Sequence, residues 1–516
     1  MISIINSSNI MGVDSFDVSV ETDISNGIPS FNIVGLPGTE IKEARERVKS
    51  AIINSGYIFP NSRIVVNLSP ADIKKQGAFL DLPISIGILR GKITSDRKNI
   101  EESIFVGELS LNGDIKEIKG VLPIVIGSRD RGYKRIFIPY NNYSECSFIK
   151  GIDIIPVKSL KKCIAILNGG ISENEIEILK EESLSMNIKS VENIKYDDFV
   201  DIKGNIFLRR CAEISAAGGH HMLMIGPPGS GKSFVAKRIP GILPNMDDDE
   251  ALEVNKIYSV YGNKKDINKR PFRSPHHTVT EKSLIGGGSD ARAGEITLAH
   301  KGILFLDEIP EFDRRTLEAL RQPIEDKKVN ISRIRNSISY PSDFLMISAM
   351  NPCPCGYFGS EKECRCKRYE IDRYLGKLSG PLLDRIDIFV EVESMGFEDI
   401  SSSESGESSE AIKYRVQRAR EIQRKRFKEH NGKTNRDINI SDINRYCNLD
   451  DKCKKVLEII FKKYRLSNRS YTRLVSVART IADLSDRKDI NEDDILEAFS
   501  MRKVYYKYFE RNKLEF

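Results

Sequence analysis

The pattern G-x-x-x-x-G-K-[ST] is matched by Gly226-Pro227-Pro228-Gly229-Ser230-Gly231-Lys232-Ser233. An apolar run at 222–225 predicts a buried strand before it, and residues 234–238 predict the start of a helix after it. The glycines let backbone N–H groups surround a phosphate, and the helix N-terminus adds its positive end. Lys232 is expected to reach the β- and γ-phosphates, and Ser233 to hold Mg²⁺. These flanks disfavour a chance match in a glycine-rich turn, so the sequence predicts a nucleoside triphosphate site for ATP with Mg²⁺.

The composition places limits on the rest of the chain. With 516 residues it is too long for one core and suggests about three domains. The net charge is +6 with 30% charged residues, so the charge balance indicates no particular partner. The sequence contains no run of ~18 apolar residues, so no membrane span is predicted. The first residues lack the basic and small-residue marks of a signal peptide. Four of the nine cysteines fall between positions 353 and 366, unlike a secreted disulfide framework, and we expect a cytoplasmic protein.

Apolar runs, glycines and charges predict five segments in an α/β protein. Residues 1–167 show short strand patterns with helical runs between them. Residues 168–198 form an acidic and polar connector with room for one helix. Residues 199–392 contain the phosphate-binding loop and form an ATPase core. Residues 393–410 are a Ser/Glu-rich flexible hinge, and residues 411–516 have a helical pattern throughout and form a lid.

Two further strand ends are expected to meet the phosphate-binding loop. The apolar run 303–306 ends in Asp307, which would hold the Mg²⁺ shell, and Glu308, which would act as general base. A core strand capped by solvated acids is the alternative, and it is disfavoured beside a phosphate-binding loop. The run 344–350 ends at Asn351, whose amide is expected to position the attacking water.

Two arginines are candidates for contacts with the γ-phosphate. Arg385 lies in an L-L-D-R-I run, and in ring ATPases an arginine in this setting reaches into the site of the neighbouring subunit. A helix capped by Ser467 is predicted further on, and it resembles the sensor 2 element. Arg469 would touch the γ-phosphate from this helix, with Arg473 as the second choice. A solvated surface position is the alternative for each arginine.

A cysteine cluster follows Asn351 directly, and its members are Cys353, Cys355, Cys364 and Cys366. Four thiolates and a short closing loop suit tetrahedral Zn²⁺ in a structural role. Two disulfides are the alternative, which a reducing cytosol disfavours. His276-His277 has no cysteine or carboxylate at ligand spacing, so we expect a polar loop there, structural or in contact with nucleic acid.

Two segments of the core are candidates for contacts with DNA. Residues 329–340 alternate with period two about a polar turn and predict a β-hairpin. Arg333 and Arg335 could contact phosphates there, and a solvated basic turn is the alternative. The block 270–294, with its glycine triplet and Arg292, suits a loop that projects toward the pore of a ring.

These motifs together resemble an AAA+ ATPase, and longer stretches are similar to the YifB/ComM family of Mg-chelatase-like AAA+ ATPases. The stretches that carry this similarity lie at 31–37, 270–277, 284–288, 294–300 and 351–356. The resemblance runs nearly end to end. It implies an AAA+ P-loop core with a Lon-protease-like α/β domain before it and a helical lid after it.

The first segment by itself resembles the protease domain of the Lon family, in the runs 107–113 and 120–139. Lon proteolysis needs a serine that a lysine amine activates. The serine position falls on Phe79, and the lysine position on Leu122 or Ile124, all of which are apolar. We therefore expect the Lon-like fold without the Ser-Lys dyad, and no protease activity.

The family resemblance implies an Mg-dependent ATPase that forms a homo-oligomeric ring, expected to be a hexamer, and translocates on DNA. It implies a helicase or branch-migration factor in recombination or natural transformation, and the basic run 415–428 is a further candidate surface for DNA. The alternative is a Mg-chelatase-like motor that remodels a protein complex or drives metal insertion, although no D-x-S-x-S motif is present. A chaperone partner of a separate protease is a third possibility.

Overall fold

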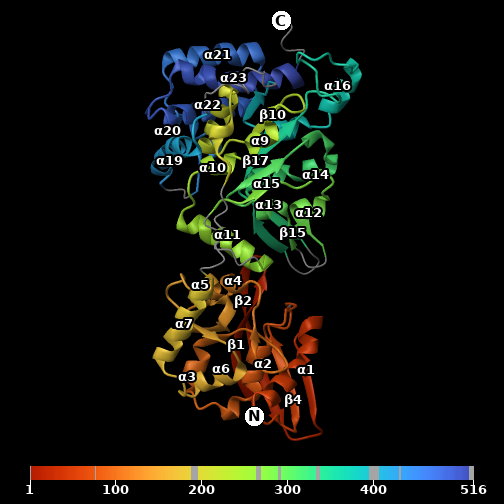
Figure 1. The fold of residues 1–516 in the computed structure, drawn as a ribbon, viewed down its shortest axis with the longest axis vertical. Helices are drawn as coiled ribbons and strands as arrows, with labels where there is room; N and C mark the ends of the chain where they lie inside the picture. Colours follow the sequence, from red (N-terminus) through yellow and green to blue (C-terminus); the bar gives the residue numbers. More distant parts are fainter. Residues whose placement is uncertain are drawn as a thin grey trace. The chain divides into compact units, whose positions relative to one another are not determined.

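A computed structural model gives the fold of residues 2–75, 77–187, 196–262, 269–288, 292–332, 337–393, 406–428 and 432–510. The chain divides into two compact units (Figure 1). The amino-terminal unit is Met1–Asn193 with Ala251–Ile267, and the P-loop unit is Ile194–Glu250 with Asn268–Phe516. The predicted α/β class is confirmed. The segment Ala251–Ile267 belongs to the amino-terminal unit, although it lies inside the range that we expected to form the ATPase core.

The amino-terminal unit contains two main sheets. The first has the order β1-β2-β4-β3, in which β3 and β4 are parallel and the other pairs are antiparallel. Its strands are β1 (Ile2–Met11), β2 (Asp14–Ser25), β3 (Ser30–Val34) and β4 (Arg63–Ser69). The second is parallel with the order β5-β8-β9. Its strands are β5 (Ser103–Phe105), β8 (Arg135–Pro139) and β9 (Asp153–Val157), and a small hairpin joins β6 (Glu108–Leu109) to β7 (Ile115–Lys116).

The helices of this unit differ in how much of their surface is buried, from one stripe in α1 to every position in α2. In α1 (Thr39–Asn54) the buried positions recur at helical spacing, and they are Ile41, Ala44, Val48, Ala51 and Ile52. The other helices are α2 (Asp81–Ile88), α3 (Arg97–Glu101), α4 (Val121–Asp130), α5 (Tyr143–Cys146), α6 (Leu160–Leu167) and α7 (Glu173–Asn187). The connector that we expected at 168–198 contains α7, which packs on this unit, since Leu179 is buried and Ser183 Oγ donates to Tyr140 O at 2.9 Å.

The positions that correspond to the Lon dyad lie together in one apolar core. Phe79 is 8% exposed, Leu122 is 1% exposed and Ile124 is 0% exposed, and all three belong to a single hydrophobic cluster. The cluster also contains residues of β5 and β8, so it joins the parallel sheet to α4. The three residues that we expected at the dyad positions thus pack as part of the hydrophobic core.

The P-loop unit is built on a five-stranded sheet with the order β11-β14-β17-β10-β18, in which all neighbours are parallel. The strands are β11 (Phe272–Arg273), β14 (Ile303–Leu306), β17 (Leu345–Met350), β10 (Met222–Ile225) and β18 (Ile388–Glu391). The side chains of β10, β14 and β17 are buried along the whole of each strand. Continuous apolar runs are typical of parallel strands that are covered on both faces.

Short helices and two hairpins surround this sheet. The helices are α8 (Ile206–Gly218), α9 (Lys232–Ala236), α10 (Ile239–Ile242), α12 (Glu281–Ile285), α13 (Glu295–Leu298), α14 (Arg314–Ala319), α15 (Arg321–Asp326), α16 (Arg368–Leu375) and α17 (Gly380–Leu383). A further helix, α11 (Asp248–Tyr261), begins in this unit, but most of it belongs to the segment Ala251–Ile267 of the amino-terminal unit. The predicted hairpin before β17 is confirmed as β15 (Lys328–Ser332) paired with β16 (Ser337–Pro341). A smaller hairpin pairs β12 (Gly286–Gly287) with β13 (Arg292–Ala293) inside the block 270–294.

The helical lid, drawn in blue in Figure 1, follows β18. Its helices are α19 (Ser409–Arg426), α20 (Ile443–Tyr446), α21 (Asp451–Tyr464), α22 (Asn468–Leu484) and α23 (Glu492–Phe509). The predicted cap of α22 is confirmed, because Ser467 Oγ accepts a hydrogen bond from Ser470 N. No helix in the described part of the chain has the length and apolar character needed to cross a membrane.

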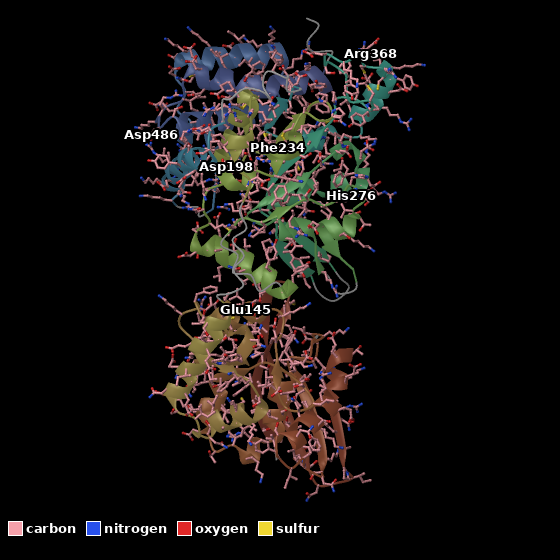
Figure 2. All side chains as sticks on the ribbon, in the orientation of Figure 1. Glu145, Asp198, Phe234, His276, Arg368 and Asp486 are labelled. Atoms are coloured by element: carbon pink, nitrogen blue, oxygen red, sulfur yellow. The ribbon has the colours of Figure 1, made fainter. Side chains whose placement is uncertain are left out.

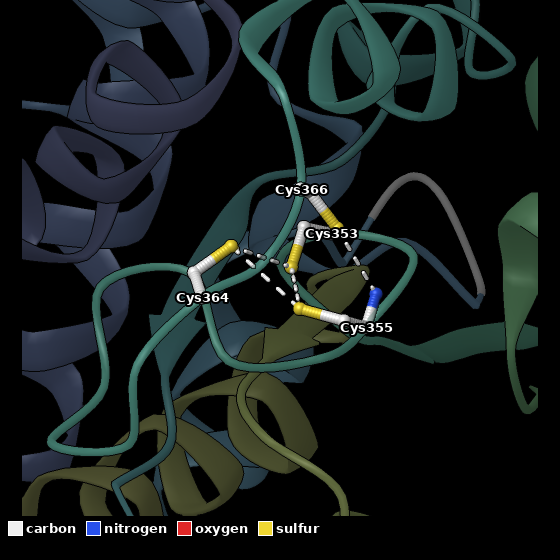
Figure 3. Close-up of side chains that lie close together, drawn as sticks. All are labelled: Cys353, Cys355, Cys364 and Cys366. Carbon is white, nitrogen blue, oxygen red and sulfur yellow. Dashed lines mark hydrogen bonds between the residues drawn. The ribbon is translucent and has the colours of Figure 1, made fainter.

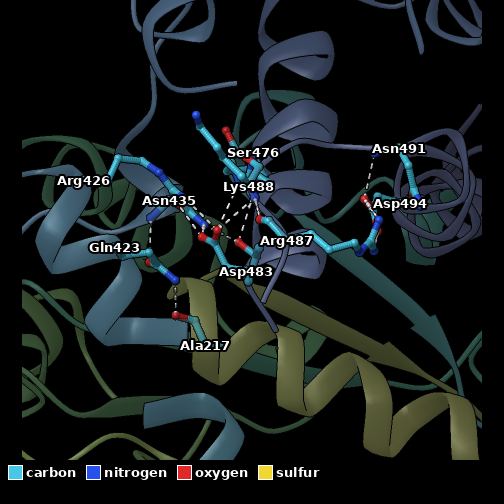
Figure 4. A network of polar contacts seen from close by, with 12 residues as sticks. Ala217, Gln423, Arg426, Asn435, Ser476, Asp483, Arg487, Lys488, Asn491 and Asp494 are labelled. Atoms are coloured by element: carbon cyan, nitrogen blue, oxygen red, sulfur yellow. Dashed lines mark hydrogen bonds and ion pairs between the residues drawn. The ribbon is translucent and has the colours of Figure 1, made fainter. Parts of the chain in front are cut away.

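A buried carboxylate organises the interior of the lid (Figure 4). Asp483 has a fully buried side chain and accepts hydrogen bonds from Arg426, Asn435 and Arg479. Three donors from three segments satisfy this charge, which would be costly to bury alone. Gln423 extends the network to the core by donating to Ala217 O at the end of α8, at 3.0 Å.

Candidate nucleotide site and metal centre

Three neighbouring parallel strands end at the three predicted motifs. β10, β17 and β14 lie side by side in the sheet. Gly226 follows β10 directly, Asn351 follows β17, and Asp307 follows β14. The carboxyl ends of parallel strands meet at one edge of the sheet, where ligands of open α/β sheets bind. The fold therefore brings the phosphate-binding loop, the acidic pair and the amide to the same edge.

The phosphate-binding loop depends on its glycines. A Cβ on Gly226 would overlap the carbonyl oxygen of Val392, so only glycine fits between β10 and that carbonyl group. Gly229 and Gly231 have φ angles of +80° and +87°, in the left-handed region that glycine adopts without strain. The remaining residues of the loop before α9 are Pro227, Pro228 and Ser230.

Lys232 is buried, and its ammonium group is held by the loop. Nζ donates to the carbonyl oxygens of Gly226 and Pro227 at 2.7 and 2.8 Å, and to Asn351 Oδ1 at 3.3 Å. Burial lowers the pKa of Lys232 to about 8, against the attraction of the two acidic residues that follow β14. Neutral carbonyl oxygens are weak partners for a buried cation, so an anionic phosphate is the ligand that this amine favours.

Ser233 and Asp307 provide oxygen atoms that suit Mg²⁺. Ser233 Oγ donates to Asp307 Oδ2 at 2.6 Å, so the hydroxyl and the carboxylate already lie together. Mg²⁺ binds through one or two carboxylates together with the phosphates of a substrate, which matches this pair beside the phosphate-binding loop. The residues present therefore fit the metal.

Glu308 is exposed and has an unusual backbone conformation. Its φ and ψ angles are 49° and 47°, in the left-handed region, which costs a non-glycine residue energy. The backbone N–H of Glu308 donates to Asp307 Oδ1 at 3.0 Å, which helps to hold this turn. The carboxylate of Glu308 thus remains accessible at the strand end, where a general base would have to lie.

Arg385 lies at the opposite edge of the sheet from the phosphate-binding loop. It precedes β18, and the backbone N–H groups of Asp387 and Ile388 donate to His221 O, just before β10 begins. The length of β10, about 13 Å at ~3.3 Å per residue, therefore separates Arg385 from the loop. Its side chain is only 8% exposed. Arg385 does not reach the nucleotide site of its own chain.

Arg469 lies with Arg385. Its guanidinium group pairs with Glu325 Oε1 at 2.5 Å, while Arg385 pairs with Glu325 Oε2 at 2.8 Å. Burial acts to raise the pKa of Glu325, but the hydrogen bonds from Arg469 and Arg385 outweigh it and the pKa is lowered. The second choice, Arg473, instead pairs at 3.2 Å with the buried Asp387, which lies in the core just before β18. Sequence reasoning missed Glu325, because one acidic residue in a short helix gives no spacing signal.

The predicted DNA contacts are placed only in part. Arg333 and Arg335 lie outside the described residues, although both strands of their hairpin are described. His276 is exposed (Figure 2), and its ring centroid lies 4.1 Å from that of His277. Arginines of the basic run in α19 pair with carboxylates of the same unit, and these pairs are Arg415–Glu213, Arg418–Asp486, Arg424–Asp247 and Arg426–Asp483. DNA phosphates would have to compete with these carboxylates.

The cysteine cluster has the geometry of a metal centre (Figure 3). The ligand atoms of Cys353, Cys355, Cys364 and Cys366 all lie within 4.8 Å of one another, and this is the only such group among the residues whose structure is described. The sulfur of Cys353 lies 3.4 Å from Cys355 Sγ and 3.7 Å from Cys364 Sγ. Zn–S bonds of ~2.3 Å in a tetrahedron imply sulfur atoms about 3.8 Å apart, so the four residues fit Zn²⁺.

Backbone amides support the thiolates of this cluster. The N–H of Phe358 donates to Cys353 Sγ at 3.3 Å, and the N–H of Cys355 donates to Cys366 Sγ at 3.4 Å. Burial acts to raise the pKa of Cys355, but donors that include the N–H groups of Tyr357 and Arg365 bring it down to about 6. Cys355 is therefore a thiolate at neutral pH and a ready ligand for a cation.

The cysteine loop packs against the phosphate-binding loop. A Cβ on Gly356 would lie 2.5 Å from Pro228 Cδ, so the two loops are in close contact. On its other side, Phe358 makes an edge-to-face contact with Tyr508 of α23, with 6.4 Å between the ring centroids. A metal bound by the cluster would thus stiffen a support that links the phosphate-binding loop to the lid.

We predict about one zinc ion per chain in protein purified without chelators, measured by elemental analysis. Replacement of Cys364 and Cys366 by Ser should remove the metal, since two ligands cannot hold it, and should also weaken nucleotide binding, because the cysteine loop supports Pro228. Replacement of the buried Cys163, which lies in the amino-terminal unit, by Ala is the matched control and should leave both properties unchanged. A metal-free parent protein would contradict this prediction.

Comparison with known proteins gives matches along most of the chain. Residues 198–400 match the family described as magnesium chelatase, subunit ChlI, residues 20–142 match subunit ChlI of Mg-chelatase, and residues 406–502 match the C-terminal part of that subunit. The chain is 38% identical to the competence protein ComM of Haemophilus influenzae over 98% of both chains. It is 39% identical to YifB of Escherichia coli over 98% of this chain and 97% of that protein.

A weaker match concerns the Lon resemblance. Lon protease 2 of Bacillus subtilis is 27% identical over 183 residues, which is 32% of each chain. The glycine loop, the acidic pair after β14 and the amide after β17 lie at one edge of the sheet, inside the segment that matches the magnesium chelatase family. This geometry and the full-length similarity together show that the chain belongs to the YifB/ComM family of Mg-chelatase-like AAA+ ATPases.

Proposed function

We propose that this protein is a Mg²⁺-dependent ATPase that forms a homo-oligomeric ring, with six copies, and uses ATP hydrolysis to translocate on DNA. The observation that carries the proposal is the placement of Arg385 and Arg469 at the sheet edge opposite the phosphate-binding loop. In the described residues of a single chain, the loop and the acidic pair lie together, but neither candidate arginine, Arg385 or Arg469, lies at that site. A second copy, which offers that edge, would complete the site.

In the proposed reaction, the oxygen of a water molecule bonds to the γ-phosphorus as the bond to the bridging β-phosphate oxygen breaks, so ADP leaves and inorganic phosphate forms. Glu308 accepts the proton of that water, and Asn351 orients it from the end of β17. Lys232 binds the β- and γ-phosphates, and the arginine of the neighbouring copy stabilises the negative charge that develops. Mg²⁺, held by Ser233 and Asp307, would neutralise phosphate charge when it is bound.

DNA is proposed as the track for two reasons. One relative is named a competence protein, and this name supports a role in natural transformation or recombination. The hairpin β15–β16 leads into β17, the strand that ends at Asn351. A ligand bound to the hairpin would therefore be connected through β17 to the residue that orients the attacking water. The family descriptions also support a second candidate, a motor that remodels a protein complex or drives metal insertion as magnesium chelatase subunits do.

Lys232→Ala is expected to abolish ATP binding, because the buried ammonium group that favours a phosphate is lost. Glu308→Gln is expected to retain ATP binding and to lose hydrolysis, because only the general base is removed. Binding of a fluorescent ATP analogue and phosphate release measure the two properties separately. Equal loss of nucleotide affinity in both variants would contradict this division of roles.

Arg385→Ala should leave ATP binding nearly intact and lower turnover by about 10³-fold or more in the assembled ring, the scale of a lost arginine finger. Mixtures of Arg385→Ala with Lys232→Ala protein should recover part of the activity, because one variant supplies intact loops and the other supplies intact arginines. Phosphate release across mixing ratios tests this. No recovery at any ratio would count against a site shared between copies.

Arg333→Ala/Arg335→Ala is expected to weaken binding of single-stranded DNA equally for all sequences and to leave basal ATPase activity intact. Each lost phosphate contact should lower the slope of log affinity against log salt by roughly 1. Stimulation of ATPase activity by DNA should fall in parallel. A parent protein that neither binds DNA nor responds to it would favour the second candidate function.

A further inference from the structure

Glu325 joins two arginines that are far apart in the sequence and that both have proposed roles at the γ-phosphate. Its Oε2 pairs with Arg385 at 2.8 Å, and its Oε1 pairs with Arg469 at 2.5 Å. Arg385 precedes β18 of the core, whereas Arg469 lies in the first turn of α22 in the lid. One carboxylate thus takes the place that a phosphate would take between these two cations.

Every nitrogen of the Arg385 guanidinium group has a partner on its own chain. Nη1 donates to Pro381 O, Nε donates to Arg321 O at 3.2 Å, and Nη2 pairs with Glu325. Two of these partners belong to α15, Arg321 through its backbone carbonyl group and Glu325 through its side chain, so this short helix holds the arginine at two points. An arginine in this position must leave α15 before it can contact a phosphate bound elsewhere.

The pairs with Glu325 are strong enough to hold the arginines and weak enough to open. The Glu325 side chain is 41% exposed and that of Arg469 is 35% exposed, so water screens this pair. Water reaches the second pair only from the Glu325 side, because the Arg385 side chain is only 8% exposed. The γ-phosphate of ATP carries more charge and more acceptor oxygens than a carboxylate, and it competes well for two guanidinium groups. Exchange of Glu325 for a phosphate is therefore favourable once a second copy presents its nucleotide.

The same helix connects the arginines to the hairpin. α15 ends at Asp326, one residue before Lys327 and two before β15 begins. Lys327 in this junction pairs with Asp437 of the lid at 2.8 Å. A ligand that moves the hairpin would act through this junction on α15, and hence on the distance between Glu325 and its two arginines.

We propose that Glu325 is a latch that holds Arg385 and Arg469 retracted on their own chain, and that it releases them together to the γ-phosphate of a neighbouring copy when the hairpin is engaged. This inference rests on the proposed function, in which the arginines act between copies. Glu325 is a positioning residue, since it contacts the arginines and not the nucleotide. It sets a low basal rate of ATP hydrolysis that a ligand of the hairpin can raise.

Glu325→Gln tests the latch, because the amide has the shape of the carboxylate but lacks its charge. Its basal ATPase activity should rise by about two- to tenfold, the scale expected for the loss of two partly screened ion pairs. The ratio by which a single-stranded oligonucleotide stimulates the activity should fall by a similar factor. Glu325→Asp retains the charge but lacks the reach for both arginines, and it should give an intermediate basal rate.

Glu407→Gln is a matched control. Glu407 is 42% exposed and pairs with Arg415 through both oxygen atoms, and it contacts neither Arg385 nor Arg469. The Glu407→Gln variant therefore loses a comparable ion pair in the same unit without affecting the two arginines. It should hydrolyse ATP at the basal rate of the parent. The thermal melting temperatures of all variants show whether each one is folded.

The double variant Glu325→Gln/Arg385→Ala separates the two proposals. It should be as inactive as Arg385→Ala, because the latch acts only through that arginine. If Arg385→Ala is inactive while folded Glu325→Gln and Glu325→Asp have unchanged or lower basal rates, the latch is wrong and the proposed finger stands. If the double variant keeps a raised rate, Glu325 acts by another route. If Arg385→Ala alone is fully active, the finger itself is wrong, and the latch falls with it.

Discussion

The parallel alignment of β10, β17 and β14 is the constraint on which the rest of the P-loop unit depends. In the strand register, Ile225 lies beside Met350 and Leu306 lies beside Ser348, so the three strands end close to one another at one edge. Three segments that are distant in the sequence thereby meet around Lys232. Neither the amine, the acidic residues nor the amide would form a site alone; the sheet register aligns them, and the hydrogen bonds from Lys232 to Asn351 and from Ser233 to Asp307 link the three strand ends directly.

The same sheet places the phosphate-binding groups and the candidate arginines of one chain at opposite ends of its strands. Its carboxyl edge holds the phosphate-binding loop, while its amino edge holds Arg385 and, through Glu325, Arg469. The length of the strands keeps these two edges of one chain apart. A chain built in this way is suited to act beside copies of itself, with the arginine edge of one copy turned toward the loop of the next.

Buried charges connect the lid to the core on the arginine side. Asp343, before β17, pairs with Arg436 of the lid at 2.8 Å and with Lys301 at 3.1 Å. Although burial acts to raise it, these cations hold the pKa of Asp343 well below its usual range, so the carboxylate stays charged inside the fold. A movement of the lid would have to break such pairs or carry the core residues with it. The lid and the arginine edge are thus mechanically coupled.

Local features could be predicted from the sequence because consecutive residues determine them. The phosphate-binding loop and its flanking strand, the acidic strand end, the hairpin before β17, the Ser467 cap and the cysteine spacing all lie within short windows. The apolar residues Phe79, Leu122 and Ile124 also predicted the loss of a Lon-type dyad, and the structure places them in one core.

Tertiary structure decided what depends on contacts between distant segments. The sequence could not show that Ala251–Ile267 joins the amino-terminal unit, because its helix continues across the boundary. It could not separate Arg469 from Arg473, since both lie on one helix and only their partners, Glu325 and Asp387, distinguish them. It also could not show that arginines of α19 pair with carboxylates of the same unit, and so it suggested that they were available to bind DNA. The sequence by itself determined which groups the protein carries, and the fold decided which charges meet, because an ion pair depends on distance in space and not on separation along the chain.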